Sequence, residues 1–138
     1  MNYRHIFHLS IPVADLELAK RFYVGVLGAM IGRENESWLD VLLWGHQITL
    51  QCRPSEVFPL EQQGKRHFGV VLPWETWECE AERVRSIGTP FLGEPKILLD
   101  GTGEEQAKFH LADPSNNIIE IKAYRDVAGT LGVSQPLA

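Results

Sequence analysis

The stretch from His67 to Gly88, HFGVVLPWETWECEAERVRSIG, decides the fold because it repeats a stretch near the start of the chain. Residues His8 to Gly28 read HLSIPVADLELAKRFYVGVLG. In each copy a histidine opens an apolar strand, an amphipathic helix follows, and a glycine ends the helix. That glycine lies 21 positions after the histidine in one copy and 20 in the other. A supersecondary unit that occurs twice predicts two similar modules, each with a histidine at the same place.

The residue two positions after each histidine is small. It is Ser10 in the first copy and Gly69 in the second. Side chains alternate between the two faces of a strand, so this small residue shares a face with the histidine. We therefore expect each histidine to border a hollow rather than a packed wall.

The rest of the chain predicts the order β-α-β-β-β in both halves, and hence an α+β fold. In the first half we expect a strand over 3–13, a helix capped by Asp15 and ended by Gly28, and strands over 30–34, 38–44 and 47–53. In the second half we expect a strand over 66–72, a helix with Trp77, Ala81, Val84 and Ile87 as its apolar positions, a short strand near 90–92 that leads to 97–99, and strands over 107–112 and 117–124.

These elements predict one domain over 1–138. Module 1 covers about 3–53 and module 2 about 66–124. Prolines and polar residues make 54–65 a linker, and the tail 125–138 is expected to pack on the surface or on a partner.

Composition excludes several classes of partner. The chain has 138 residues and a net charge of −5, which disfavours nucleic acid and anionic membranes. No apolar run is long enough to span a membrane, and we expect no signal peptide at the start. Two cysteines that form no CxxC pair suit a reducing cytoplasm.

Glu120 is an acidic residue in an otherwise apolar strand, flanked by Ile118, Ile119 and Ile121. When the two halves are aligned, its counterpart is Thr49. A carboxylate in such a strand cannot be buried without a cation, a hydrogen-bond network or solvent.

His8, His67 and Glu120 together make a set of two histidines and one carboxylate. Neutral imidazoles and a carboxylate suit Fe(II), Mn(II), Ni(II) or Zn(II), and three protein ligands leave coordination positions for substrate and water. A single histidine in a strand is more often a core or surface residue than a ligand; the repeat favours ligation by the set.

The chain resembles the vicinal oxygen chelate superfamily, which includes glyoxalase I, fosfomycin-resistance enzymes, extradiol dioxygenases and bleomycin-resistance proteins. The resemblance rests on FYVGVLG (22–28), HFGVVL (67–72) and FHLADPSNNIIEIKAY (109–124). A single-domain group of extradiol-type dioxygenases is also similar at Trp38-Leu39-Asp40 and Gly45-His46-Gln47-Ile48.

This resemblance implies a curled mixed sheet around a metal held by His8, His67 and Glu120, with Fe(II) favoured. It also implies a small-molecule substrate that chelates the metal through two adjacent oxygens, and a homodimer. His110 occupies the position of a tyrosine in extradiol dioxygenases, and we expect it to act as a catalytic acid or base.

Three functions remain open. An extradiol-dioxygenase-like oxidoreductase is favoured because the glutamate that serves glyoxalase I as a fourth ligand is replaced by Thr49. A glyoxalase-like isomerase or lyase is the alternative within enzymes. A metal-free drug-binding protein of bleomycin-resistance type is the alternative from another class.

Overall fold

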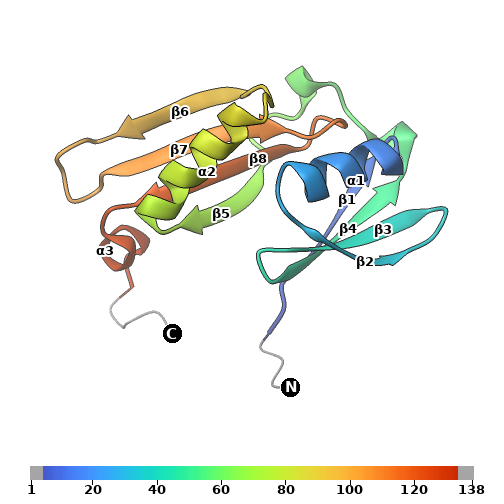
Figure 1. Cartoon of the computed structure of the whole chain (residues 1–138), viewed down its shortest axis with the longest axis horizontal. Helices are drawn as coiled ribbons and strands as arrows, with labels where there is room; N and C mark the ends of the chain where they lie inside the picture. Colours follow the sequence, from blue (N-terminus) through green and yellow to red (C-terminus); the bar gives the residue numbers. More distant parts are fainter. Residues whose placement is uncertain (1–4, 134–138) are drawn as a thin grey trace. The chain divides into compact units, whose positions relative to one another are not determined.

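The computed structural model describes residues 5–133, which form two compact units (Figure 1). The first unit comprises Met1–Arg66 and Ala112–Asn117, and the second comprises His67–Leu111 and Ile118–Ala138. Each unit contains one four-stranded mixed sheet. The α+β fold built from two β-α-β-β-β modules is therefore confirmed.

The first unit has the strand order β1-β4-β3-β2, with β1 parallel to β4 and the other pairs antiparallel. Helix α1 packs against β3 and β4. The elements are β1 (His8–Val13), α1 (Leu16–Gly25), β2 (Met30–Glu34), β3 (Trp38–Leu43) and β4 (His46–Cys52), followed by the short 3₁₀ turns Pro54–Glu56 and Leu60–Gln62.

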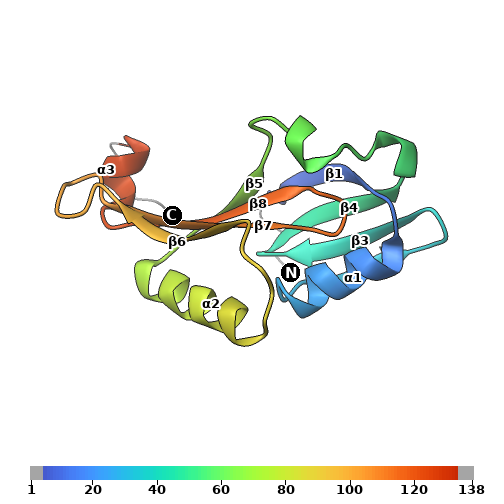
Figure 2. The same ribbon diagram turned by 90° about the horizontal axis from the view of Figure 1, so that it is seen from above.

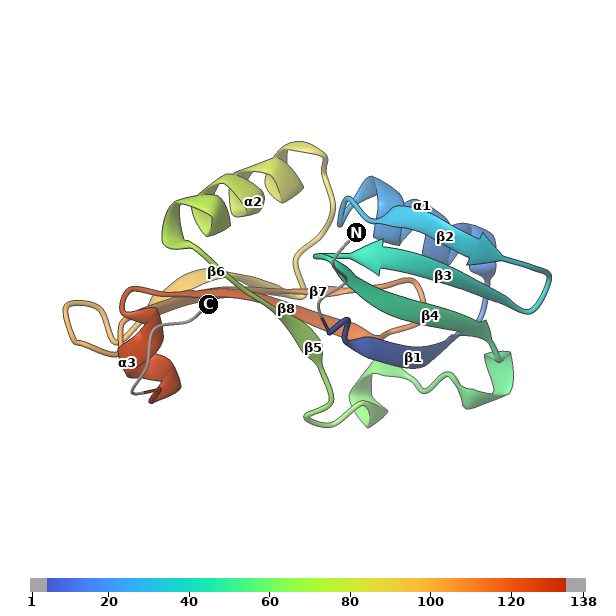
Figure 3. The same cartoon turned by 90° about the horizontal axis from the view of Figure 1, so that it is seen from below.

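The second unit repeats this plan with the strand order β5-β8-β7-β6 and β5 parallel to β8 (Figure 3). Helix α2 lies on one face of this sheet, against β8 (Figure 2). The elements are β5 (Phe68–Leu72), α2 (Trp74–Ser86), β6 (Gly93–Leu98), β7 (Gln106–Ala112), β8 (Ile118–Tyr124) and α3 (Val127–Leu131).

Alternation of side chains determines which face of the second sheet is apolar. Phe109, Ile119 and Ile121 are buried, and the Trp77 indole of α2 packs on Phe109 and donates to the Ile121 carbonyl. Side chains at the alternate positions of β7 and β8 lie on the opposite face. That face includes His110 and Glu120, and α2 does not cover it.

Asp113 fixes the turn that follows β7. Its Oδ1 accepts hydrogen bonds from the backbone N–H groups of Ser115 and Asn117, at 2.8 and 2.9 Å. Its Oδ2 accepts from the Tyr23 hydroxyl of α1 at 2.8 Å and from the Asn117 amide at 2.9 Å. The Ser115 hydroxyl in turn accepts from the backbone N–H of Ala14. The polar residues of this turn therefore hold the first unit together.

Several boundaries differ from the sequence prediction. No strand forms near 90–92; a single strand, Gly93–Leu98, overlaps the expected 97–99 and has an irregular register against β7. Ile87, expected as an apolar position of the second helix, lies just after α2 ends at Ser86 and is 50% exposed. His67 lies one residue before β5 rather than within it. The tail forms the short helix α3, whose N-cap is Asp126. Residues 134–138 of the tail, and residues 3 and 4 of the first predicted strand, lie outside the part of the chain that the structure describes.

No helix within residues 5–133 is long and apolar enough to cross a membrane.

Tyr23 should make stability fall at high pH. Burial, together with the neighbouring Asp113 carboxylate, raises the pKa of Tyr23 well above its ordinary value near 10. Above pH 10 the unfolded chain releases this proton while the folded chain keeps it, so the contribution is full below pH 10 and is lost as the pH rises. The unfolding free energy should fall by about 1.4 kcal/mol per pH unit from this group alone.

Urea unfolding at pH 8, 9, 10 and 11 measures this slope. Tyr23→Phe should be less stable at pH 8, because Asp113 loses a donor, and its stability should decline less steeply above pH 10. Equal slopes in the two proteins would contradict the assignment.

Candidate functional site

Each sheet contains a row of paired residues at equivalent positions. In the first sheet Ser10 of β1 pairs with Thr49 of β4, and in the second Gly69 of β5 pairs with Glu120 of β8. This register confirms the predicted equivalence of Thr49 and Glu120.

The next strand continues the row. In the first sheet Asp40 of β3 pairs with Thr49, and a Cβ at Gly32 would lie 3.3 Å from the Asp40 Cβ. In the second sheet His110 of β7 contacts Glu120 and pairs with Gly93 of β6. A Cβ at Gly93 would lie only 2.8 Å from the His110 ring, so glycine makes room for that ring. Each module thus places a polar pair between two small residues.

Glu120 is the centre of the row in the second unit. It is 9% exposed, and an imidazole contacts each of its carboxylate oxygens. His67 Nε2 lies 3.3 Å from Oε2, and His110 Nε2 lies 3.2 Å from Oε1. Two ammonium groups stand slightly further away, Lys122 Nζ at 3.8 Å and Lys108 Nζ at 3.9 Å. The compensation that the sequence required of a buried carboxylate comes from these four side chains.

His110 is biased towards its neutral form. Burial lowers the pKa of this imidazole, and the nearby Lys108 and His67 lower it further, against the opposite effect of Glu120. A neutral imidazole can both hold and accept a proton, which suits an acid–base role.

A hollow lies beside this cluster. A pocket of about 260 Å³ in the second unit is lined by His67, Gly69, Glu120 and Lys122, among others. The expectation that His67 borders a hollow is confirmed. The first unit has a pocket of about 410 Å³ whose lining includes Ser10 but not His8, so there the expectation holds for the small residue only.

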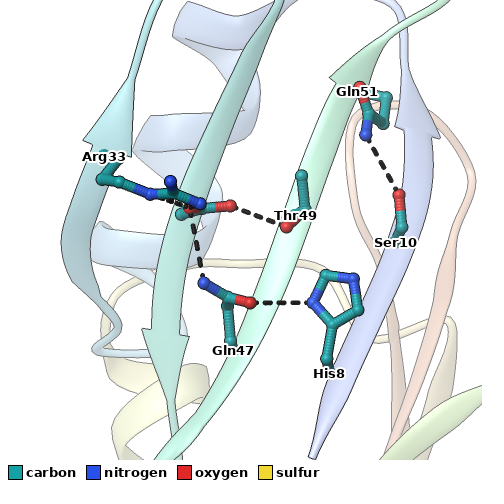
Figure 4. Close-up of polar contacts among 7 residues, drawn as sticks. His8, Ser10, Arg33, Gln47, Thr49 and Gln51 are labelled. Carbon is teal, nitrogen blue, oxygen red and sulfur yellow. Dashed lines mark hydrogen bonds and ion pairs between the residues drawn. The ribbon is translucent and has the colours of Figure 1, made fainter.

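In the first unit, hydrogen bonds orient His8 (Figure 4). Its Nδ1 lies 2.8 Å from Gln47 Oε1, and the Gln47 amide nitrogen donates to Asp40 at 3.4 Å. Since the amide oxygen can only accept, His8 Nδ1 carries a proton, and in the neutral imidazole the lone pair is then on Nε2. Metal-binding histidines commonly have this arrangement, in which one ring nitrogen is fixed by a hydrogen bond and the other faces the ligand.

Asp40 anchors this network from a buried position. It accepts from the Thr49 hydroxyl at 2.6 Å and pairs with the Arg33 guanidinium at 3.0 Å. The carboxylate therefore holds Gln47, and through Gln47 it holds the tautomer of His8.

The predicted ligands are partly brought together. His67 and Glu120 are in contact in the second unit, joined by His110, whereas His8 belongs to the first unit. Among the residues that the structure describes, no three His, Cys, Asp or Glu side chains form a group that could hold a metal ion. The donor types fit a divalent cation: an oriented imidazole in one unit, and an imidazole with a buried carboxylate in the other.

The sequence patterns assign no role to Asp40 or Lys108 and make Lys122 only a possible ion-pair partner of Glu120. Asp40 carries the signal that marked Glu120, a lone acidic residue in an apolar strand, WLDVLL. The two lysines could have been found by alternation, because Lys108 shares a strand face with His110, and Lys122 with Glu120.

Comparison with known proteins identifies the family. The model of the Glyoxalase/Bleomycin resistance protein/Dioxygenase superfamily matches residues 5–121. The chain belongs to this superfamily. A comparison with curated proteins gave no match.

Solved structures with the same fold include three with different described roles. A glyoxalase/bleomycin resistance protein/dioxygenase from Alicyclobacillus acidocaldarius is 29% identical over 89% of this chain and 93% of that one, with a TM-score of 0.76. The antibiotic-binding protein TnmS3 from Streptomyces sp. CB03234 is 25% identical over 90% and 98%, with a TM-score of 0.60. The fosfomycin resistance protein FosX from Listeria monocytogenes is 18% identical over 88% and 94%, with a TM-score of 0.68, which is a likeness of fold.

Replacing Gly69 should disrupt the cluster. A Cβ at this position would overlap the backbone of Glu120, so Gly69→Ala must force β5 away from β8. We expect the free energy of unfolding to fall by about 3 kcal/mol. Gly103→Ala is the matched control, since a Cβ there meets nothing within 4 Å. Urea denaturation measures both, and a Gly69→Ala protein as stable as the control would contradict the close approach.

Proposed function

We propose that the protein is a metal-dependent enzyme that holds a divalent cation with His8, His67 and Glu120. Its substrate is a small molecule with two adjacent oxygens. The observation that carries the proposal is Glu120, a buried carboxylate with an imidazole nitrogen against each oxygen. Membership of the superfamily supports it, and so does the hydrogen bond to His8 Nδ1, which in the neutral ring leaves the lone pair on Nε2.

The bound cation would supply a Lewis acid that holds the two substrate oxygens and stabilises negative charge on them. Fe(II) is the favoured ion, and Mn(II), Ni(II) or Zn(II) suit the same donors. The ligand set takes one residue from the first unit and two from the second. We propose a homodimer, so these residues belong either to one chain or to two copies of it.

An extradiol-dioxygenase-like reaction is the favoured class. The position of a fourth carboxylate ligand is held by Thr49, whose hydroxyl is committed to Asp40. Asp40 is itself engaged by Arg33 and Gln47, which leaves it poorly suited to remove a proton from a substrate carbon. A glyoxalase-like isomerase or lyase is correspondingly less favoured.

His110 is the proposed acid–base group. Its Nε2 points at Glu120 Oε1 from the neighbouring strand, which places a neutral imidazole beside a proposed ligand atom. Because the carboxylate oxygen can only accept, the neutral imidazole carries its proton on Nε2, and from there the proton can be donated to a substrate in the adjoining pocket.

A binding protein is the second candidate. The likeness to TnmS3, described as an antibiotic-binding protein, favours it. A protein that only sequesters a compound has no need of a buried carboxylate set between imidazoles, and this is the reason for ranking it second.

Metal binding separates these candidates. Purified anaerobically without chelator, the protein should bind close to one divalent ion per chain. His8→Ala, His67→Ala and Glu120→Ala should each lower the affinity at least a hundredfold, because each removes one of three proposed ligands. Competition with a chromophoric chelator measures the affinity.

His5→Ala is the matched control, since it removes an exposed histidine that has no proposed role, and it should keep full affinity. Absence of metal from the unmodified protein after reconstitution would overturn the enzyme proposal and leave the binding protein.

His110→Gln should separate chemistry from metal binding. The amide can still donate a hydrogen bond to Glu120 but cannot hold a transferable proton. We expect metal affinity within threefold of the unmodified protein and a turnover number lower by about 10² to 10⁴ with any catechol that the Fe(II) protein oxidises. Oxygen consumption measures turnover. Unchanged turnover would remove His110 from the mechanism, and isomerisation without oxygen uptake would favour the glyoxalase-like reaction.

A further inference from the structure

We infer that Lys108 and Lys122 form an anion-binding pair, which becomes available to a ligand when a cation binds Glu120 in their place. The substrate therefore carries an anionic group such as a carboxylate, phosphonate, phosphate or sulfate. This inference rests on the proposed function and adds the charge class of the substrate.

Positive charges outnumber negative charges around Glu120. Both ammonium groups approach the one carboxylate, Lys108 at 3.9 Å from Oε1 and Lys122 at 3.8 Å from Oε2. A single ion pair would neutralise a carboxylate, so this group of charges has a surplus positive charge even with both histidines neutral. The chain as a whole has a net charge of −5, so the local excess runs against the protein's general balance.

A third lysine adds to the surplus. Lys96 of β6 pairs in register with Lys108 of β7. Like charges directly opposite each other across two strands are destabilising. A local arrangement that costs stability without a structural gain is characteristic of functional sites.

The lysines face open space as well as the carboxylate. Lys122 lines the 260 Å³ pocket together with His67 and Glu120, and its side chain lies over the Tyr124 ring at 5.1 Å. The side chains of Lys108 and Lys122 are 25% and 22% exposed. The Lys122 side chain therefore borders the pocket directly, and the Lys108 ammonium lies next to Glu120, which also lines it.

A cation on Glu120 would change what the lysines require. Without a cation, the Glu120 carboxylate partly neutralises the two ammonium groups and so weakens their attraction for another anion. Once a divalent ion engages Glu120, the lysines lose their counter-charge and their attraction for a second anion increases. Cation and anion should then raise each other's affinity, since coupling between two binding sites is reciprocal.

Replacing one of these lysines should change the affinities for the metal and for the anion in different directions. Removing a lysine removes repulsion against an incoming cation, so metal affinity should hold or rise. It also removes attraction for an anion, so anion affinity should fall. A lysine that serves only to stabilise the fold would lower both affinities together.

The first test needs no metal. Metal-free protein is titrated with sulfate at constant ionic strength, and backbone amide shifts are followed by ¹H–¹⁵N NMR. Glu120→Gln removes the competing carboxylate, so it should bind sulfate at least tenfold more tightly than the unmodified protein, with shifts centred on β7 and β8. Adding Lys108→Met to Glu120→Gln should abolish that gain.

The second test uses the metal. Lys108→Met should bind Co(II) at least as tightly as the unmodified protein, and the Co(II)-loaded variant should bind sulfate at least tenfold more weakly. Lys20→Met is the charge-matched control, because its ammonium is paired with Glu34 at 2.8 Å and not with Glu120.

The outcomes separate the two proposals. Failure to bind Co(II), with a sulfate gain in Glu120→Gln, would overturn the metal site and keep the anion pair. No sulfate gain in Glu120→Gln, or a Lys108→Met protein indistinguishable from Lys20→Met, would overturn the anion pair whatever the metal does.

Discussion

A buried carboxylate in an apolar strand is the constraint on which the second unit depends. Glu120 cannot keep its charge on the face of β8 without partners, and the neighbouring strands supply them: His110 and Lys108 from β7, and His67 from just before β5. Gly69 lets β5 come close enough to β8, and Gly93 leaves room for the His110 ring. The small residues and the basic residues of this unit are thus explained by the same carboxylate.

The two modules each bury a carboxylate in the equivalent row of residues, but the partners of that carboxylate differ. In the first, the row holds Thr49 and Asp40, and the carboxylate is satisfied internally by Arg33, Gln47 and the threonine hydroxyl. In the second, the row holds Glu120 and His110, and the partners of the carboxylate are two imidazoles and two ammonium groups. One module therefore orients a histidine, and the other surrounds a buried carboxylate with basic side chains.

Much of this was predictable from the sequence, because strand alternation and the internal repeat are local patterns. They predicted the order of elements, the cap at Asp15 and the pairing that makes Thr49 the counterpart of Glu120. The strand expected near 90–92 was wrong: the strand begins at Gly93, and its irregular register against β7 cannot be read from one strand alone. The roles of Gln47 and Asp40 depend on contacts across strands, which spacing does not reveal.

The most direct measurement of the central claim is X-ray absorption at the metal edge of the Zn(II)-loaded protein. The proposal predicts a shell with two imidazoles and a carboxylate oxygen, from His8, His67 and Glu120, with no sulfur. A sulfur ligand from Cys52 or Cys79, or a shell with one imidazole or none, would contradict the assignment of the metal to these residues.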